Sequence, residues 1–187
     1  AFGAAIASRI NLAFLIGLLG LAVIVQIAPI FDRALARGER ERILGRAFLG
    51  CVLAGIGAFL AFRLGNPYAF MGPGFFGLSL NPRWLQDLAT AQTLVRGDAD
   101  SPPNFQWLGR APYFFPWWNM VMWGMGLAFG LTAWASLIWA GWRIIRGRPG
   151  ALANLIPLIW VLVYFGYMGR QWVMTMRYFL PIYMALA

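Results

Sequence analysis

Long apolar runs, separated by short polar or charged segments, occupy most of the chain. About 20 predominantly apolar residues are enough for an α-helix to cross a bilayer. The pattern therefore predicts an all-α polytopic transmembrane helical bundle, a single domain with about five spans, at residues 10–31, 47–64, 117–142, 151–168 and 178–187. Because the last run stops at Ala187, before it could cross, we expect a fragment of a longer protein.

The longest interruption between apolar runs is the loop at residues 65–116, which is rich in aromatic residues. A solvated tether would not leave so much aromatic surface exposed, so this loop is expected to pack over the mouth of the bundle. Asn81 followed by Pro82 is a helix start signal and Gly97 is a stop signal, with apolar residues at helical spacing between them. These signals predict an amphipathic helix over residues 82–96, lying at the membrane surface.

Composition supports lipid as the outer solvent. Hydrophobic residues make up 61% of the 187 residues and charged residues only 11%, whereas soluble domains carry about 25% charged residues. All 15 basic residues are Arg and the chain has no His, which excludes His-based catalysis. The Arg residues lie mostly beside apolar segments, as at membrane helix ends, so no nucleic-acid partner is expected. The single cysteine, Cys51, excludes an internal disulfide.

Arginine density predicts the topology, because cytoplasmic loops of membrane proteins concentrate positive charge. Residues 32–46 contain five Arg and residues 143–150 contain three, a much higher density than elsewhere in the chain. Both segments are therefore predicted to be cytoplasmic turns of a multi-pass protein in the cell (inner) membrane. The loop at 65–116 and the turn at 169–177 are then extracytoplasmic.

Small residues at helical spacing predict where helices approach one another. Gly50, Ala54 and Ala58 recur every four residues in the second run, and Gly126 with Gly130 forms a GxxxG pattern in the third. Such stripes let backbones come close, so each is expected to be a helix contact face. Arg63, at the end of the second run, is expected to extend its side chain to the membrane interface.

Three kinds of candidate functional residue fall on the predicted outer side. Asp98 and Asp100 are alternate carboxylates that could face one divalent cation or one sugar hydroxyl, but a polar turn is the plainer interpretation. Three arginines could hold a phosphate or simply contact lipid headgroups, and three aromatic residues could stack on a sugar or belong to the interfacial belt. The arginines are Arg110, Arg170 and Arg177, and the aromatic residues are Trp107, Tyr113 and Tyr178.

The amino-acid sequences of three segments resemble those of a known family. These are the runs at 62–70, beginning Phe-Arg-Leu-Gly-Asn-Pro, at 102–107, Pro-Pro-Asn-Phe-Gln-Trp, and at 171–183, which contains Arg-Tyr-Phe-Leu-Pro-Ile-Tyr. They resemble the very hydrophobic YYY-domain membrane proteins of Chloroflexi and archaea. Those proteins look like relatives of the C-type glycosyltransferases, which include the protein O-mannosyltransferases.

This resemblance implies a membrane enzyme that transfers a sugar from a polyprenyl-phosphate donor, with its active site on the extracytoplasmic side. It implies that Arg177 lies near the donor phosphate, and it leaves room for a divalent cation, Mg or Mn, held by Asp98 and Asp100 as the catalytic carboxylates. One departure is clear, because the superfamily's principal acidic motif lies in the first outer loop near the protein's N-terminus, and this fragment is expected to begin after it. This leaves open a catalytic carboxylate outside the sequence. The alternative is a non-catalytic integral-membrane subunit packed among other membrane subunits, and a transporter ranks third because no acidic residue lies within a span.

Overall fold

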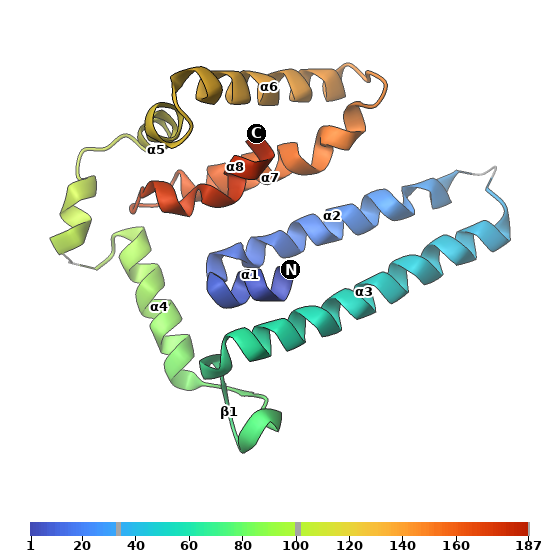
Figure 1. The fold of residues 1–187 in the computed structure, drawn as a ribbon, viewed down its shortest axis with the longest axis horizontal. Coiled ribbons are helices and arrows are strands. Elements are labelled where there is room, and N and C mark those ends of the chain that lie inside the picture. Colours follow the sequence, from blue (N-terminus) through green and yellow to red (C-terminus); the bar gives the residue numbers. More distant parts are fainter. Residues whose placement is uncertain (33–34, 100–101, 187) are drawn as a thin grey trace. The chain divides into compact units, whose positions relative to one another are not determined.

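The computed structural model of the chain describes residues 1–32, 35–99 and 102–186. The described residues are mostly helical, with one two-stranded hairpin, which confirms the all-helical class (Figure 1). Four helical segments are long and apolar enough to cross a membrane: Leu12–Phe31, Arg37–Gly65, Leu127–Ile145 and Ala151–Met168. The chain divides into two compact units, Ala1–Leu85 and Gln86–Ala187, and each is described by itself.

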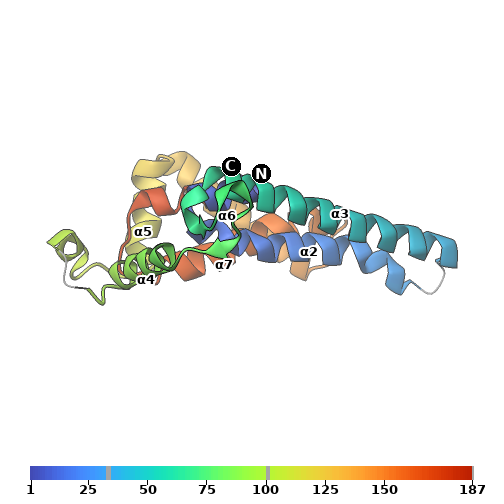
Figure 2. The same ribbon diagram turned by 90° about the horizontal axis from the view of Figure 1, so that it is seen from below.

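The first unit is built on a helical hairpin. The short 3-10 helix η1 (Ile10–Phe14) leads into α2 (Leu15–Ile27) and η2 (Ala28–Phe31), and α3 (Arg37–Gly65) returns beside them (Figures 1 and 2). A further helix, α1 (Phe2–Ser8), precedes the first predicted span and packs on α3. Gly3 lies so close to Ala58 that an added Cβ would overlap the Ala58 backbone. The small-residue stripe of the second run is thus a helix contact at Ala58, whereas nothing lies near Gly50.

The helix α3 is longer than the predicted second span, which was 47–64. It begins at Arg37, inside the segment expected to be a connector, and continues without a break to Gly65. Arg37 and Glu41 form an ion pair at 3.4 Å with the i, i+4 spacing that supports an exposed helix. The prediction of a connector over 32–46 missed this extension because charged residues end an apolar run without ending a helix.

A small hairpin follows α3 and covers Arg63. The segment comprises η3 (Pro67–Ala69), β1 (Phe70–Met71), η4 (Gly74–Phe76) and β2 (Ser79–Leu80), with Phe70 paired to Leu80 in an antiparallel register. Arg63 is only 8% exposed, donates to the Gly74 carbonyl at 3.4 Å and lies 5.0 Å from the centre of the Phe70 ring. The expectation that Arg63 reaches outward to an interface is therefore wrong, because the hairpin folds back over it.

The helix predicted at 82–96 is confirmed, with the same bounds, as α4 (Pro82–Arg96). Asn81 caps its start, because the Asn81 Oδ1 accepts the backbone N–H of Arg83 at 3.0 Å. Gly97 ends it with a φ of 86°, a conformation that favours glycine. Its position at a membrane surface stays a prediction.

The third predicted span, 117–142, is divided into several pieces in the second unit. After η5 (Pro102–Trp107) come α5 (Phe114–Asn119), a π-helical turn η6 (Met120–Gly124) and α6 (Leu127–Ile145). Gly126 separates the last two with φ 80° and ψ 148°, and nothing lies near it. An added Cβ on Gly130 would instead meet Val121 Cα at 2.7 Å. Gly126 and Gly130 thus do not share a helix face, and the predicted GxxxG contact is wrong.

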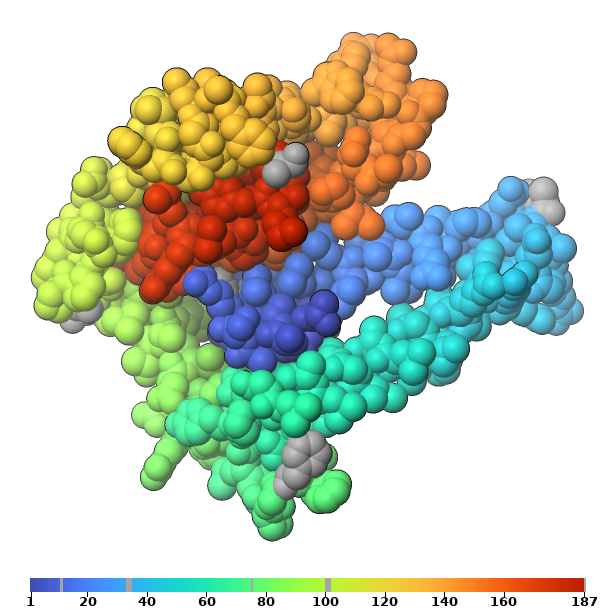
Figure 3. All heavy atoms as spheres, in the orientation of Figure 1, coloured from blue at the N-terminus to red at the C-terminus, as the bar shows by residue number. Residues whose placement is uncertain are grey.

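The rest of the second unit folds around a small buried core. The segments are η7 (Ala151–Asn154), α7 (Leu155–Met168), η8 (Met176–Tyr178) and α8 (Leu180–Leu186). Tyr164, Phe179 and Ile182 are fully buried between them. Trp160 Nε1 donates to the Pro181 carbonyl at 3.0 Å, which ties α8 to α7. In the space-filling view the red atoms of α8 lie directly against the yellow atoms of α6 (Figure 3).

Candidate functional site

The turn that leaves α7, residues 169–175, is held by three segments from the first half of the second unit. These are the end of α4, the chain at Asn104 and the backbone at Tyr113. We call this the loop–turn junction, defined by Gly97, Asn104, Tyr113, Gly169 and Trp172. It brings together parts of the two segments that the sequence predicted to be extracytoplasmic.

The end of α4 forms one side of the loop–turn junction. The Val95 carbonyl accepts the backbone N–H groups of Trp172 at 3.1 Å and Val173 at 3.2 Å. An added Cβ on Gly97 would meet the Trp172 ring at 2.6 Å. Gly97 is therefore required twice, by its positive φ and by the closeness of the indole.

Asn104 bridges the same two segments. Its carbonyl accepts the Trp172 Nε1–H at 3.1 Å, and its Nδ2 donates to the Leu94 carbonyl at 3.1 Å. The Nε1–H group is the only hydrogen-bond donor of an indole ring, so this bond fixes the orientation of the Trp172 ring. Nothing in the Pro-Pro-Asn-Phe-Gln-Trp run predicts a role for Asn104, since a single Asn in a loop carries no signal for a partner 68 residues away.

Tyr113 supplies the third side and carries backbone strain. Its φ is 61° and its ψ is −51°, and the Phe114 N–H donates to the Pro112 carbonyl at 2.6 Å, which makes a γ-turn. The Tyr113 N–H donates to the Gly169 carbonyl at 3.0 Å. An added Cβ on Gly169 would meet the Tyr113 ring at 2.6 Å. A strained conformation of this kind costs about 1–3 kcal/mol and persists only where surrounding contacts enforce it.

Three candidate residues lie on the segments joined at this junction. Asp98 follows Gly97 directly and is exposed, with its backbone N–H bonded to the Thr93 carbonyl at 3.0 Å. Arg170 follows Gly169 and is also exposed. Tyr113 belongs to the junction itself. Asp100, the other predicted carboxylate, lies outside the described residues.

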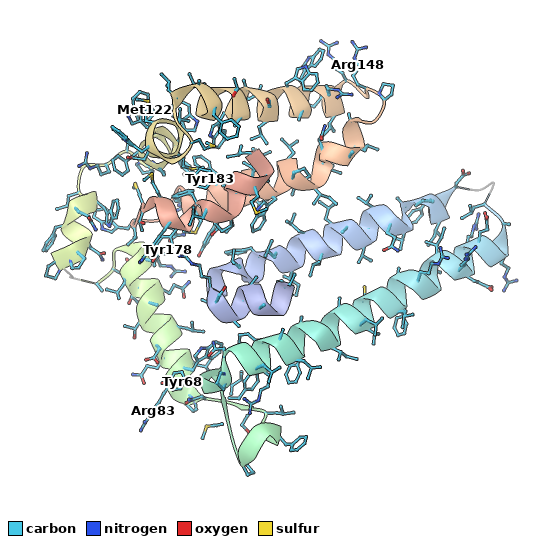
Figure 4. The ribbon with its side chains drawn as sticks, in the orientation of Figure 1. Tyr68, Arg83, Met122, Arg148, Tyr178 and Tyr183 are labelled. Atoms are coloured by element: carbon cyan, nitrogen blue, oxygen red, sulfur yellow. The ribbon has the colours of Figure 1, made fainter. Side chains whose placement is uncertain are left out.

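The remaining candidates form two separate pairs. Trp107 and Arg110 both contact Phe115, with ring centres 6.2 Å apart for Trp107 and the guanidinium carbon of Arg110 at 4.9 Å from the ring centre. Arg177 is exposed and lies 5.5 Å from the ring centre of Tyr178. Tyr178 is labelled in Figure 4. Its carbonyl accepts the Tyr164 hydroxyl at 2.8 Å, which anchors this pair to α7.

The divalent cation predicted at Asp98 and Asp100 stays a prediction, because Asp100 lies outside the described residues. No group of three or more His, Cys, Asp or Glu side chains gathers anywhere in 1–32, 35–99 and 102–186. Mg²⁺ is usually bound by only one or two carboxylates together with water and substrate phosphates, and Asp98 is one exposed carboxylate.

Comparisons with protein-family models, with curated proteins and with solved structures find no match to this chain.

Proposed function

We propose that the chain is part of a membrane glycosyltransferase that takes a sugar from a polyprenyl-phosphate donor on the extracytoplasmic side. What supports the proposal is that a carboxylate, an aromatic ring and a guanidinium, those of Asp98, Tyr113 and Arg170, lie on segments tied to a single turn. A carboxylate can activate a hydroxyl, an aromatic ring can stack on a sugar, and a guanidinium can bind a phosphate. The turn follows α7, part of a segment long and apolar enough to cross a membrane.

In the proposed reaction a hydroxyl oxygen of the acceptor attacks C1 of the donor sugar. The bond between C1 and the phosphate oxygen breaks, and its electron pair leaves with the polyprenyl phosphate. Asp98 accepts the proton of the acceptor hydroxyl as the general base. Arg170 and Arg177 offset the charge that develops on the departing phosphate, with Arg110 of the loop at 65–116 as a further cation.

The first test is the replacement Asp98→Asn in the full-length protein in nanodiscs. Removal of a general base lowers turnover about a hundredfold or more, and an exposed Asp98 should leave stability unchanged. The measurement is sugar transfer from a polyprenyl-phosphate donor, with Asp87→Asn on α4 as the charge-matched control. Equal activity of Asp98→Asn and the control would exclude Asp98 as the base.

The second test concerns the shape of the cation. Arg177→Lys keeps the charge but loses the planar fork that binds two phosphate oxygens, so turnover should fall more than the melting temperature. Arg83→Lys, at an exposed position of α4, is the control. Full activity of Arg177→Lys would indicate a simple headgroup contact, because a lysine reaches an interface as well as an arginine does.

The proposed topology has five spans in the cell (inner) membrane, with both Arg-rich segments in the cytoplasm and residues 65–116 outside. Four of these spans contain helices of sufficient length and apolarity. In a variant with Cys51 replaced by Ala, a cysteine introduced at Arg40 should resist an impermeant thiol reagent in intact cells, whereas one at Leu78 should react. The reverse pattern would show that the orientation is inverted.

The second candidate function is a non-catalytic integral-membrane subunit. The observation that favours it is the bare apolar surface of the first unit, where the most apolar window of Leu12–Phe31 contains no buried residue. Lipid or the helices of other subunits would cover such a surface. Purification of the full-length protein in mild detergent distinguishes the two, since a subunit would copurify with stoichiometric membrane partners and show no sugar transfer.

A further inference from the structure

The turn after α6 gathers three arginines around two tryptophan rings. Arg143 lies 4.9 Å from the centre of the Trp139 ring, and Arg146 and Arg148 lie 5.8 and 5.9 Å from the Trp142 ring. Figure 4 shows Arg148 at this turn, with its side chain directed away from the helices. We call Trp139, Trp142, Arg143, Arg146 and Arg148 the Trp–Arg turn.

Local geometry builds this cluster. Trp139 with Arg143, and Trp142 with Arg146, are spaced i, i+4 and therefore share faces of α6. Gly147 then adopts a φ of 60°, and the Arg148 N–H donates to the Arg143 carbonyl at 3.0 Å. This is a Schellman motif, and it returns Arg148 to the Trp142 ring. Arg143 also donates from its Nη2 to the Pro149 carbonyl at 3.0 Å, which closes the turn.

No Asp or Glu within residues 101–187 balances the three charges. That segment contains neither residue type, and among the described residues none of the three arginines forms an ion pair with an acid. The carbonyl end of a helix offers only about half a negative charge. Two guanidinium groups around one indole ring repel each other, so an anion between or beside them would be stabilising.

The position of the turn identifies the kind of anion. It ends α6, a segment long and apolar enough to cross a membrane, so its arginines lie at the depth of lipid headgroups if α6 spans. Trp139 is 56% exposed and Trp142 is 44% exposed, as suits rings in contact with an interface. We propose that the Trp–Arg turn is a binding site for the phosphate of an anionic phospholipid. This inference requires membrane insertion and is independent of sugar transfer.

The Arg-rich start of α3 provides the contrast. Its arginines are interspersed with Glu39 and Glu41, and Arg37 is paired with Glu41. Charge at this segment is therefore partly balanced within the chain. We expect it to prefer anionic lipid much less strongly than the Trp–Arg turn does.

The experiment measures lipid selectivity of the full chain, reconstituted in phosphatidylcholine vesicles with spin-labelled phosphatidylglycerol or phosphatidylcholine. Arg146→Gln with Arg148→Gln should lower the relative association of phosphatidylglycerol at least about fivefold, given the contribution of a basic residue near an anionic surface. Arg42→Gln with Arg46→Gln removes the same charge from α3 and should have a smaller effect. Equal reductions would overturn the proposal in favour of a general charge effect.

A second variant keeps the charge and removes the ring. Trp142→Leu should lower selectivity for phosphatidylglycerol about two- to fivefold, the size expected from the loss of an exposed cation–π contact. Circular dichroism checks that the variant keeps its helix content. Unchanged selectivity would overturn the proposal that the ring and the arginines form one site. Displacement of the labelled lipid by excess inorganic phosphate would also overturn the proposal, because it would identify a free anion as the ligand.

Discussion

The two units of the molecule differ in the contacts that stabilise each of them internally. In the first unit, α1 meets α3 through small residues, at Gly3 with Ala58 and at Ala7 with Gly65. The large apolar side chains of α2 and α3 face outward, as with Ile16, Phe48 and Leu53. In the second unit, α7 and α8 enclose fully buried Tyr164 and Phe179, and side chains donate hydrogen bonds to distant carbonyls. The first unit relies on its surroundings to cover its apolar surface, whereas the second has a core and a polar framework of its own.

This difference indicates which unit fixes the positions of its side chains more closely. Van der Waals contact between small residues places helices near each other but fixes few side chains. A buried hydrogen bond to a backbone carbonyl has a narrow geometry, and its loss leaves a polar group unsatisfied. The predicted site residues are therefore positioned mainly by the second unit. Nine of the ten Trp residues lie in the second unit, so near-ultraviolet circular dichroism reports its packing selectively.

The largest effect is expected from Gly97→Ala in the loop–turn junction. The substitution combines a positive φ with overlap on the Trp172 ring, and should cost about 2–4 kcal/mol of stability in the second unit. Gly109→Ala is the matched control, because Gly109 has a φ of 68° with nothing near it, and should cost only about 1 kcal/mol. Thermal unfolding by near-ultraviolet circular dichroism measures both. Equal shifts would mean that the close contact with Trp172 has no energetic weight.

A smaller effect is expected from Tyr164→Phe. The change removes a buried hydroxyl that donates to the Tyr178 carbonyl, and should cost about 1–2 kcal/mol. Tyr113→Phe removes a hydroxyl from a 42% exposed side chain and should stay within about 0.5 kcal/mol of the unchanged protein. The same unfolding measurement compares them, and a larger loss in Tyr113→Phe would reverse the expected order.

The smallest effect on global unfolding is expected from Gly3→Leu in the first unit. A side chain at this position overlaps the Ala58 backbone, so α1 should leave α3 while the apolar helices stay in lipid. Cysteines introduced at Ala7 and Gly65, which are close in space, report this contact by disulfide formation once Cys51 is replaced by Ala. The crosslink should form in the parent and in Gly17→Leu, where nothing lies nearby, and fail in Gly3→Leu. A retained crosslink would show that α1 tolerates the displacement.

The sequence by itself determined the features that depend on neighbours within a few residues. The Asn81 cap, the Gly97 stop and the apolar spacing between them predicted α4 with its observed bounds, because helix ends are decided by local hydrogen bonds. The apolar runs likewise predicted the four helices of membrane-spanning length. The sequence also identified Asp98, Tyr113 and Arg170 as candidates, from residue type and loop position alone.

Only the tertiary structure decided which of these features come together. Apolar composition is the same in an α-helix, a π-turn and a break, so the run at 117–142 gave no sign of its interruption before α6. Nor could spacing along the chain indicate that Asn104 bonds to Trp172, or that Tyr113 bonds to Gly169. These bonds join residues more than 50 positions apart, and they form because packing of whole segments brings one carbonyl within reach of one donor.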